Sequence, residues 1–290
     1  MNIEYRSHYF DDIATKTSFK KYADAIFGLD FSRWEAKGLW DSQYVPFSAF
    51  IDGKCIASIC VYPSEITIDG KKERWAQLLT VGTLPEYRHR GIHYELWKRA
   101  HAWIQESCRL TFLFTDDDVV GFYERLGFKR QLEYFDAIVL EATASVDAPQ
   151  SKKLDIANSA DYALIARLVE QREPVSQKLG FHTPNLLLFM LLYPYVDLTY
   201  YIEELDTVVI AEQTADGIRI HDVIAPKMPT FAELEPFFRQ FGSRHIDFLF
   251  CTDKLGLRDC VKKMVTESAL MVSDEFDYPS DYVFPFSIRA

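Results

Sequence analysis

Two arginines and two histidines surround a single glycine in the stretch PEYRHRGIH, residues 85–93. An apolar, strand-like run from Leu78 to Thr83 precedes this stretch, and a helical pattern follows it. The first turn of a helix has backbone N–H groups without internal partners, and the helix dipole adds positive charge there. Gly91 lets an anion approach the backbone, and Arg88 and Arg90 can donate charged hydrogen bonds to a pyrophosphate. The stretch therefore predicts either an anion site or a solvated basic loop.

The longer segment VGTLPEYRHRGIH resembles the acetyl-coenzyme A loop of the GNAT superfamily of N-acetyltransferases, whose pattern is R/Q-x-x-G-x-G/A. Arg88 and Gly91 match this pattern. The last small residue of the pattern is replaced here by His93. We expect His93→Gly to keep or improve coenzyme affinity and Gly91→Val to abolish it.

A second stretch, DDDVVGFYERLGF, resembles the other signature of the same family, N-x-x-A-x-x-x-Y-x-x-x-G-F. Asp116 stands in the place of the asparagine and Val119 in that of the alanine, while Tyr123 and Gly127-Phe128 match directly. The two motifs follow each other in the family's order, and the resemblance covers roughly residues 1 to 140.

The resemblance implies transfer of an acyl group, usually acetyl, from coenzyme A to an amine. The backbone N–H groups from Arg90 to His93 would hold the pyrophosphate, and Val81 to Thr83 would splay from the neighbouring strand and pair with the pantetheine arm. The coenzyme-binding residues implied in this way are Val81, Gly82, Thr83, Arg88, His89, Arg90, Gly91, Ile92, His93 and Asp116.

Tyr123 occupies the position at which members of the family carry the phenol that protonates the departing thiolate. The ordinary pKa of a phenol, about 10, is close enough to that of a thiol, about 8.5, for this transfer. The alternative for Tyr123 is a packing aromatic in a short helix.

The general base is less evident from the sequence. Some members of the family place a glutamate six residues before the position of Thr83, but that residue here is Gln77, which accepts no proton at neutral pH. Glu73 falls on the same face of the strand and could receive a proton through water, or it is simply a solvated charge.

The amine acceptor site is expected between the early helices and the sheet. Trp34, Trp40 and Tyr44 lie there, with Glu35 and Asp41 nearby, and aromatic rings with carboxylates suit a cation. Core packing is the alternative for an aromatic stripe of this kind.

The elements between these motifs predict a mixed α/β (α+β) fold of the GNAT-like acetyltransferase type. Hairpin turns are expected at Asp52-Gly53 and Asp69-Gly70. Strands are expected at 75–83, 110–114 and 135–140, with helices at 19–27, 31–37, 119–126 and from Ile92 onward. The run 135–140 would close the sheet of the first domain.

The second half of the chain repeats this order in outline. A hairpin around Leu205-Asp206, a strand at 218–224 and a helix at 231–241 lead to the run IDFLFCTD, which resembles LTFLF and its following Asp116. We predict a GNAT acetyltransferase domain at 1–141, a linker at 142–152 and a diverged GNAT-like α/β domain at 153–290. The latter lacks R-x-x-G-x-G, so it would not bind coenzyme A but would complete the acceptor pocket or form a homodimer.

Composition narrows the class of protein. The chain has 290 residues, 48% hydrophobic and 26% charged, with a net charge of −11, which argues against nucleic-acid binding. The acidic charge either attracts cationic substrates or only keeps the protein in solution. Its start shows no signal-peptide pattern, and the longest apolar run, 186–193, is too short for a membrane span. Five scattered cysteines fit a reducing cytoplasm and favour neither disulfides nor a metal site.

The function expected from the sequence is acetyl-coenzyme A-dependent acetylation of a small-molecule primary amine, without a metal. Two alternatives stay open: a non-catalytic acyl-coenzyme A sensor, which Gln77 and His93 favour, and a protein-lysine acetyltransferase.

Overall fold

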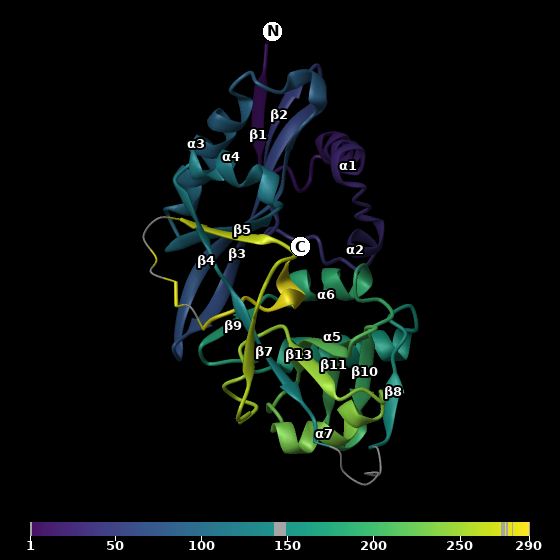
Figure 1. The fold of residues 1–290 in the computed structure, drawn as a ribbon. Coiled ribbons are helices and arrows are strands. Elements are labelled where there is room, and N and C mark those ends of the chain that lie inside the picture. Colours follow the sequence, from purple (N-terminus) through teal and green to yellow (C-terminus); the bar gives the residue numbers. More distant parts are fainter. Residues whose placement is uncertain (1, 142–148, 274–275, 277, 280, 290) are drawn as a thin grey trace. The chain divides into compact units, whose positions relative to one another are not determined.

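The computed structural model describes residues 2–141, 149–273, 276, 278–279 and 281–289. Contacts within the chain divide it into two compact units, each built from three segments (Figure 1). Unit 1 comprises Met1–Ser64, Glu73–Gln131 and Ser268–Phe276. Unit 2 comprises Glu65–Lys72, Leu132–Glu267 and Asp277–Ala290.

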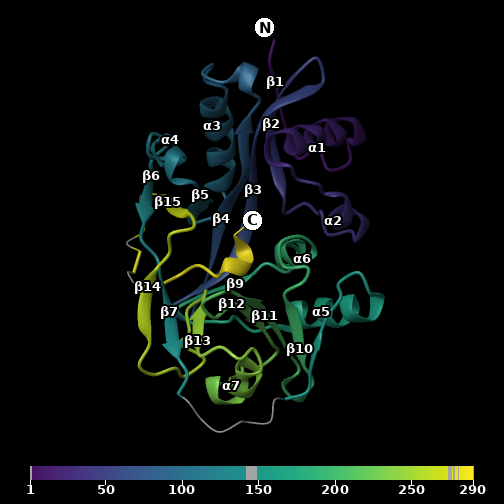
Figure 2. The ribbon, with the colours of Figure 1, turned by 45° about the vertical axis from the view of Figure 1, so that its right-hand side comes forward.

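The sheet of unit 1 is mixed. In spatial order its strands are β1 (Glu4–Ser7), β2 (Val45–Ile51), β3 (Lys54–Ile68), β4 (Lys71–Thr83), β5 (Leu110–Thr115), β15 (Ala269–Ser273) and β6 (Phe128–Gln131). Strands β4 and β5 are parallel and enclose a helix in the sequence, whereas β15 is antiparallel to both β5 and β6. Figure 2 shows β15 between these two strands.

Two long helices cover opposite faces of this sheet (Figure 2). Because side chains alternate along β2, Phe47 faces Trp103 of α3 (Ile92–Ile104), whereas Ser48 faces Tyr9, which packs on Phe19 of α1 (Ile13–Phe27). The shorter helices are α2 (Ser32–Ala36) and α4 (Val120–Glu124), with single 3₁₀ turns at η1 (Pro85–Tyr87) and η2 (Asp117–Val119).

The sheet of unit 2 has the same plan. Its strands, in spatial order, are β8 (Ser151–Lys153), β10 (Thr199–Ile202), β11 (Thr207–Gln213), β12 (Ile218–Ile224), β13 (His245–Phe248), β7 (Tyr134–Val139) and β14 (Val261–Met264). Here β12 and β13 form the parallel pair. The helices are α5 (Ser159–Gln171), α6 (Pro184–Leu192) and α7 (Phe231–Arg239), with 3₁₀ turns at η3 (Glu203–Leu205) and η4 (Phe286–Ile288).

The two sheets correspond strand by strand, which confirms the predicted mixed α/β class with a second, similar domain. The strand expected to close the first sheet does form, as β7, but it pairs with β13 and β14 in unit 2. Its place in unit 1 is taken by β15, from the C-terminal part of the chain. The prediction of where β7 lies was wrong because an apolar run identifies a strand but not its partner.

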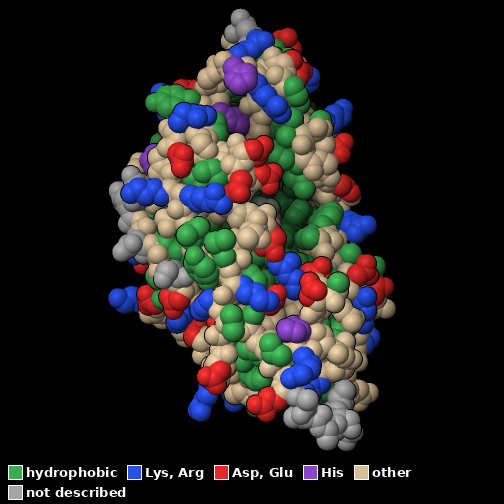
Figure 3. Space-filling model, viewed as in Figure 1, with side chains coloured by type: hydrophobic (Ala, Val, Ile, Leu, Met, Phe, Trp, Pro, Cys, Tyr) green, Lys and Arg blue, Asp and Glu red, His purple; other side chains and the backbone are tan. Residues whose placement is uncertain are grey.

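The domain limits 1–141 and 153–290 stay a prediction. Of the predicted linker 142–152, residues 142–148 lie outside the described residues, and strand β8 begins at Ser151. The tip of the β3–β4 hairpin, 65–72, belongs to unit 2, where β3 pairs with β9 (Leu179–His182). On the face drawn in Figure 3, acidic and basic side chains are interspersed instead of gathering by sign.

Candidate active site

The end of strand β4 departs from its neighbour. β4 pairs with β5 through three residues only, Trp75–Gln77 opposite Leu110–Phe112. Three residues further on, Thr80 has a φ of 49°, a left-handed conformation that interrupts the regular strand. The backbone of Val81–Thr83 beyond it lines a cavity instead of continuing the pairing with β5.

The loop after β4 is shaped by two left-handed residues, His89 with a φ of 61° and Gly91 with a φ of 74°. Turns of this kind direct successive backbone N–H groups toward one point, where they can receive an anion. A Cβ on Gly91 would meet no protein atom within 4 Å, so within the protein the glycine is needed for its backbone conformation. Gly91 is also the N-cap of α3, and no side chain caps this helix. The first turn of α3 therefore offers its N–H groups to the cavity.

The two arginines of the loop form hydrogen bonds with backbone carbonyls of the same segment. Nε of Arg88 donates to the carbonyl of Thr83 at 3.1 Å, and a terminal nitrogen of Arg90 donates to the carbonyl of Glu86 at 2.9 Å. Both side chains are exposed at the rim of the cavity. They hold the loop in shape and keep positive charge beside the N–H groups.

His93, the residue that departs from the family pattern, connects the helix to the strand. Its Nε2 lies 2.6 Å from the carbonyl oxygen of Gly82, and its ring packs on Phe122 with centroids 5.7 Å apart. Burial lowers the pKa of His93 to about 4, so at neutral pH the ring is uncharged and donates from Nε2. The bond changes our expectation for His93→Gly, which would release α3 from β4 instead of improving coenzyme affinity.

The buried ring of His93 also predicts a pH dependence of stability. Between about pH 6.5 and pH 4, residue 93 is protonated in the unfolded chain but stays neutral in the folded protein. The free energy of unfolding therefore falls as pH falls. The loss over the whole window is on the order of 3 kcal/mol. A His93→Gln variant keeps a donor for Gly82 and does not titrate. Urea unfolding at pH 7, 5.5 and 4.5 should show wild type losing stability relative to His93→Gln, and parallel pH curves would contradict the assignment.

Tyr123 lies on α4 and is 6% exposed. Its ring contacts Phe122 and Phe128, at centroid distances of 5.1 and 6.0 Å. Burial raises the pKa of the Tyr123 phenol well above its ordinary value. The phenol therefore stays protonated throughout the physiological range and is available as a proton donor.

One cavity of about 760 Å³ joins these features. Of the residues predicted from the sequence, it is lined by Val81, Gly82, Thr83, Arg88, His89, Arg90, Gly91, Ile92, His93 and Tyr123. Residues that sequence reasoning missed complete the wall: Ile26, Phe27, Tyr87, Tyr94, Val119, Phe122, Arg125 and Leu126. Most of these are apolar, and they come from α1, the loop, α3 and α4, with its preceding 3₁₀ turn.

Helix α1 forms a wall of the cavity because Gly82 lets it approach β4. A Cβ on Gly82 would lie 2.8 Å from both Cζ of Phe27 and the hydroxyl oxygen of Tyr22, and 3.1 Å from Cγ2 of Ile26. Only a residue without a side chain permits this contact. The glycine was the one signal in the sequence for this wall, and it does not reveal which helix approaches.

Asp116 and Glu73 are not among the residues that line the cavity. Asp116 precedes the η2 turn. Glu73 lies ten residues before Thr83, about 30 Å along an extended strand. There it forms an ion pair with Arg109 and accepts a hydrogen bond from Nε1 of Trp75 at 2.8 Å.

The predicted acceptor aromatics are packed together in the interior of unit 1. Trp34 and Tyr44 are 1% and 3% exposed, and both contact Trp40, at centroid distances of 5.9 and 5.7 Å. The ammonium group of Lys16 lies 4.3 Å from the centre of the Trp40 ring. This cluster binds a cation, but the cation is a side chain of the protein itself.

In unit 2 the N-terminus of the corresponding helix is capped by side chains. Helix α7 follows β12 as α3 follows β4, and its N-cap Thr230 forms a capping box with Glu233. The carboxylate of Glu233 accepts hydrogen bonds from the backbone N–H and the hydroxyl of Thr230, both at 2.7 Å. An acidic side chain thus stands where α3 presents free N–H groups, and it disfavours a phosphate.

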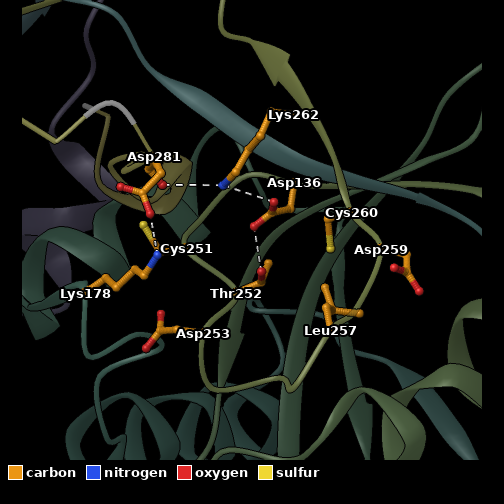
Figure 4. A pocket seen from close by; sticks show the side chains of 10 residues that line it. All are labelled: Asp136, Lys178, Cys251, Thr252, Asp253, Leu257, Asp259, Cys260, Lys262 and Asp281. Atoms are coloured by element: carbon orange, nitrogen blue, oxygen red, sulfur yellow. Dashed lines mark hydrogen bonds and ion pairs between the residues drawn. The ribbon is translucent and has the colours of Figure 1, made fainter.

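A smaller cavity of unit 2, about 290 Å³, has two lysines in its lining, and each is paired with a lining carboxylate (Figure 4). Lys178 contacts Asp281 at 2.5 Å, and Lys262 contacts Asp136 at 3.0 Å. Asp136 also accepts a hydrogen bond from the hydroxyl of Thr252 at 2.6 Å. Both lysines of this cavity are therefore neutralised by carboxylates within the fold.

The family model of the acetyltransferase (GNAT) family matches residues 8–128, the span that contains the splayed strand, the loop and Tyr123. Residues 8–128 are a GNAT acetyltransferase domain. No significant relative is found among curated proteins.

Solved structures of the same fold extend over both units. A probable N-acyltransferase from Enterococcus faecalis has a TM-score of 0.60 at 16% identity, over 94% of this chain and 72% of that one. Eis1 from Mycobacterium abscessus has a TM-score of 0.55 at 18% identity, over 93% and 73%. A GCN5-related N-acetyltransferase from Anabaena variabilis has 0.56 at 15%, over 93% and 72%. At these identities the likeness shows the fold, including the second GNAT-like domain.

Two searches of the described residues complete the description of the site. Across the described part of the chain, no group of three or more His, Cys, Asp or Glu side chains is placed to hold a metal ion. Among the described helices, none combines the length and apolar character that a membrane crossing needs.

Proposed function

We propose that the GNAT domain transfers an acetyl group from acetyl-coenzyme A to a primary amine of a small molecule. The observation that carries the proposal is the single cavity that joins an uncapped helix start, a strand end that no longer pairs with β5 and a buried phenol. These are the three features that a bound phosphate, a pantetheine amide and a departing thiolate respectively require.

The residues present fit the coenzyme. N–H groups of Arg90–His93 would receive the pyrophosphate, with Arg88 adding positive charge. The backbone of Val81–Thr83, which no longer pairs with β5, would hold the pantetheine amides, and Ile26 and Phe27 supply an apolar wall beside it. When bound, acetyl-coenzyme A supplies the activated acetyl group as a thioester.

Tyr123 would then act as the general acid. Its neutral phenol would protonate the departing sulfur, which makes the coenzyme a better leaving group. The raised pKa keeps the proton on the phenol at neutral pH, so the phenol would be available to donate it to the sulfur as the carbon–sulfur bond breaks.

The amine would reach the cavity already neutral. Among the residues that line the cavity in the described structure there is no Asp or Glu, and Glu73 lies at the other end of β4. Water would therefore remove the proton of the amine, and the rate below the amine's pKa would follow the neutral fraction, about tenfold per pH unit. The acidic net charge of −11 favours the approach of cationic amines.

We further propose that unit 2 does not bind coenzyme A. Its role would be to complete the acceptor pocket or to form a homodimer. The capping box at α7 and the absence of an R-x-x-G-x-G pattern before this helix support the assignment. The expected stoichiometry is accordingly one coenzyme molecule per chain.

Calorimetry with acetyl-coenzyme A and with free coenzyme A, followed by a thiol-release assay on a panel of small amines and lysine peptides, tests the proposal. We expect one site per chain and release with a small amine. Binding without release on any acceptor would favour the second candidate, a non-catalytic sensor of acyl-coenzyme A, which the carboxylate-free lining of the cavity supports. Release with peptides alone would assign a protein-lysine acetyltransferase.

A further inference from the structure

Thr80 has a backbone conformation that is unusual for its residue type. Its φ of 49° lies in the left-handed region, where a β-branched side chain is strained by about 1–3 kcal/mol. The residue stands between Gln77, the last residue of β4 paired with β5, and Val81, the first that lines the cavity. The change of strand direction therefore depends on Thr80 staying in this conformation.

The side chain of Thr80 is held by a buried partner. The hydroxyl groups of Tyr44 and Thr80 lie 2.6 Å apart. Burial raises the pKa of Tyr44 well above its ordinary value, so the phenol is neutral and either hydroxyl can donate.

Tyr44 itself has little freedom to move. It precedes β2 directly, and its ring lies against Phe31, Trp34 and Trp40 at centroid distances of 5.8, 5.5 and 5.7 Å. A ring fixed by three aromatic neighbours presents its hydroxyl at one place. The anchor of Thr80 is thus part of the core of the domain, not of a mobile surface.

We propose that Tyr44 is a positioning residue that holds Thr80 in its left-handed conformation and so directs the backbone of Val81–Thr83 into the cavity. This inference rests on the proposed function. The predicted role of Tyr44 in binding the amine is replaced by a role in aiming the strand. In the proposed reaction a backbone N–H of Val81–Thr83 would also polarise the thioester carbonyl, and a donor of this kind acts mainly on the rate of transfer. The pyrophosphate loop, by contrast, determines most of the coenzyme affinity.

Four variants test the contact: Tyr44→Phe, Thr80→Val, the double variant and Thr80→Ser. The first two each remove one hydroxyl at nearly constant shape, and we expect each to lower kcat roughly tenfold, less than the loss of a whole oxyanion donor, with coenzyme affinity changed less than about twofold. The double variant should be no worse than either single one, because both remove the same contact. Thr80→Ser keeps a hydroxyl and should retain the wild-type kcat.

A second readout does not depend on turnover. In the free protein, amide hydrogen exchange at Val81–Thr83 should be faster in Tyr44→Phe and Thr80→Val than in wild type or Thr80→Ser. Additive losses of kcat in the double variant, or unchanged exchange in both single variants, would overturn the inference. A wild-type protein that binds no acetyl-coenzyme A would instead overturn the proposed function, and the exchange data would still decide whether Tyr44 holds the strand.

Discussion

Replacing Tyr123 with phenylalanine is expected to lower kcat by roughly 10²–10³-fold and to leave the dissociation constant of acetyl-coenzyme A nearly unchanged. The variant removes one oxygen from a ring that is packed between Phe122 and Phe128, so the wall of the cavity keeps its shape. Stopped-flow or steady-state thiol release gives kcat, and calorimetry gives the dissociation constant.

Tyr9→Phe is the matched control for this substitution. Tyr9 is buried to the same degree as Tyr123, 7% against 6% exposed, and its hydroxyl contacts Ser48 instead of the cavity. Its loss should lower the free energy of unfolding by about 1 kcal/mol without changing kcat. Equal activity of Tyr123→Phe and wild type would remove Tyr123 from the mechanism.

The pKa of Tyr123 also constrains the pH profile. Because burial raises this pKa above its ordinary value of about 10, the phenol keeps its proton at higher pH than a free tyrosine. The proton donor is therefore not lost on the alkaline side below about pH 10. A decline of kcat between pH 7 and 9 that disappears in Tyr123→Phe would be inconsistent with a protonated phenol in the resting enzyme.

Gly91→Val is expected to weaken acetyl-coenzyme A binding at least about 100-fold. Valine is strained at a φ of 74°, and the chain escapes this strain only by turning the first N–H groups of α3 away from the cavity. The loss should appear in the affinity for free coenzyme A as well, because both ligands carry the same pyrophosphate. Calorimetry with the two ligands measures it.

Gly38→Val separates this effect from strain in general. Gly38 has a φ of 69°, and a Cβ there would also meet no atom within 4 Å, but the residue follows α2 and does not line the cavity. Both variants should lose similar thermal stability, while only Gly91→Val loses coenzyme affinity. If the two variants bind coenzyme equally well, the loop at 88–93 is not the pyrophosphate site.

The local elements were largely predictable because their patterns are set by near neighbours in the sequence. Helix α3 begins at Ile92 and strand β12 spans 218–224, as the periodicity indicates. The exchange of β7 and β15 between the two sheets was not predictable. Both strands are short, mostly buried apolar runs that would fit either sheet, and the choice depends on contacts between segments more than 100 residues apart.

The candidate site likewise has one side that was predictable from the sequence and one that was not. The loop side follows from short motifs around Arg88, Gly91 and Tyr123, since each motif is one continuous segment of the chain. The opposite wall, from Ile26 and Phe27, depends on how α1 packs on Gly82, which no local pattern encodes.

The role of single aromatic and polar residues was the least predictable part. Tyr44 has aromatic and acidic residues near it in the sequence, as a cation site would. In the structure, however, its ring is buried and its hydroxyl forms a hydrogen bond with that of Thr80. His93 breaks the family pattern at one position, and only the structure shows that its ring reaches the carbonyl of Gly82. Side-chain partners of this kind lie across elements and have no signature in spacing.

Amide hydrogen exchange of the wild-type protein with and without acetyl-coenzyme A tests the central claim most directly. The account predicts protection at Val81–Thr83 and at Arg90–His93 when the coenzyme is bound, and none at the start of α7, where Glu233 caps the helix. Protection at the start of α7, with the loop at 88–93 unaffected, would contradict the account.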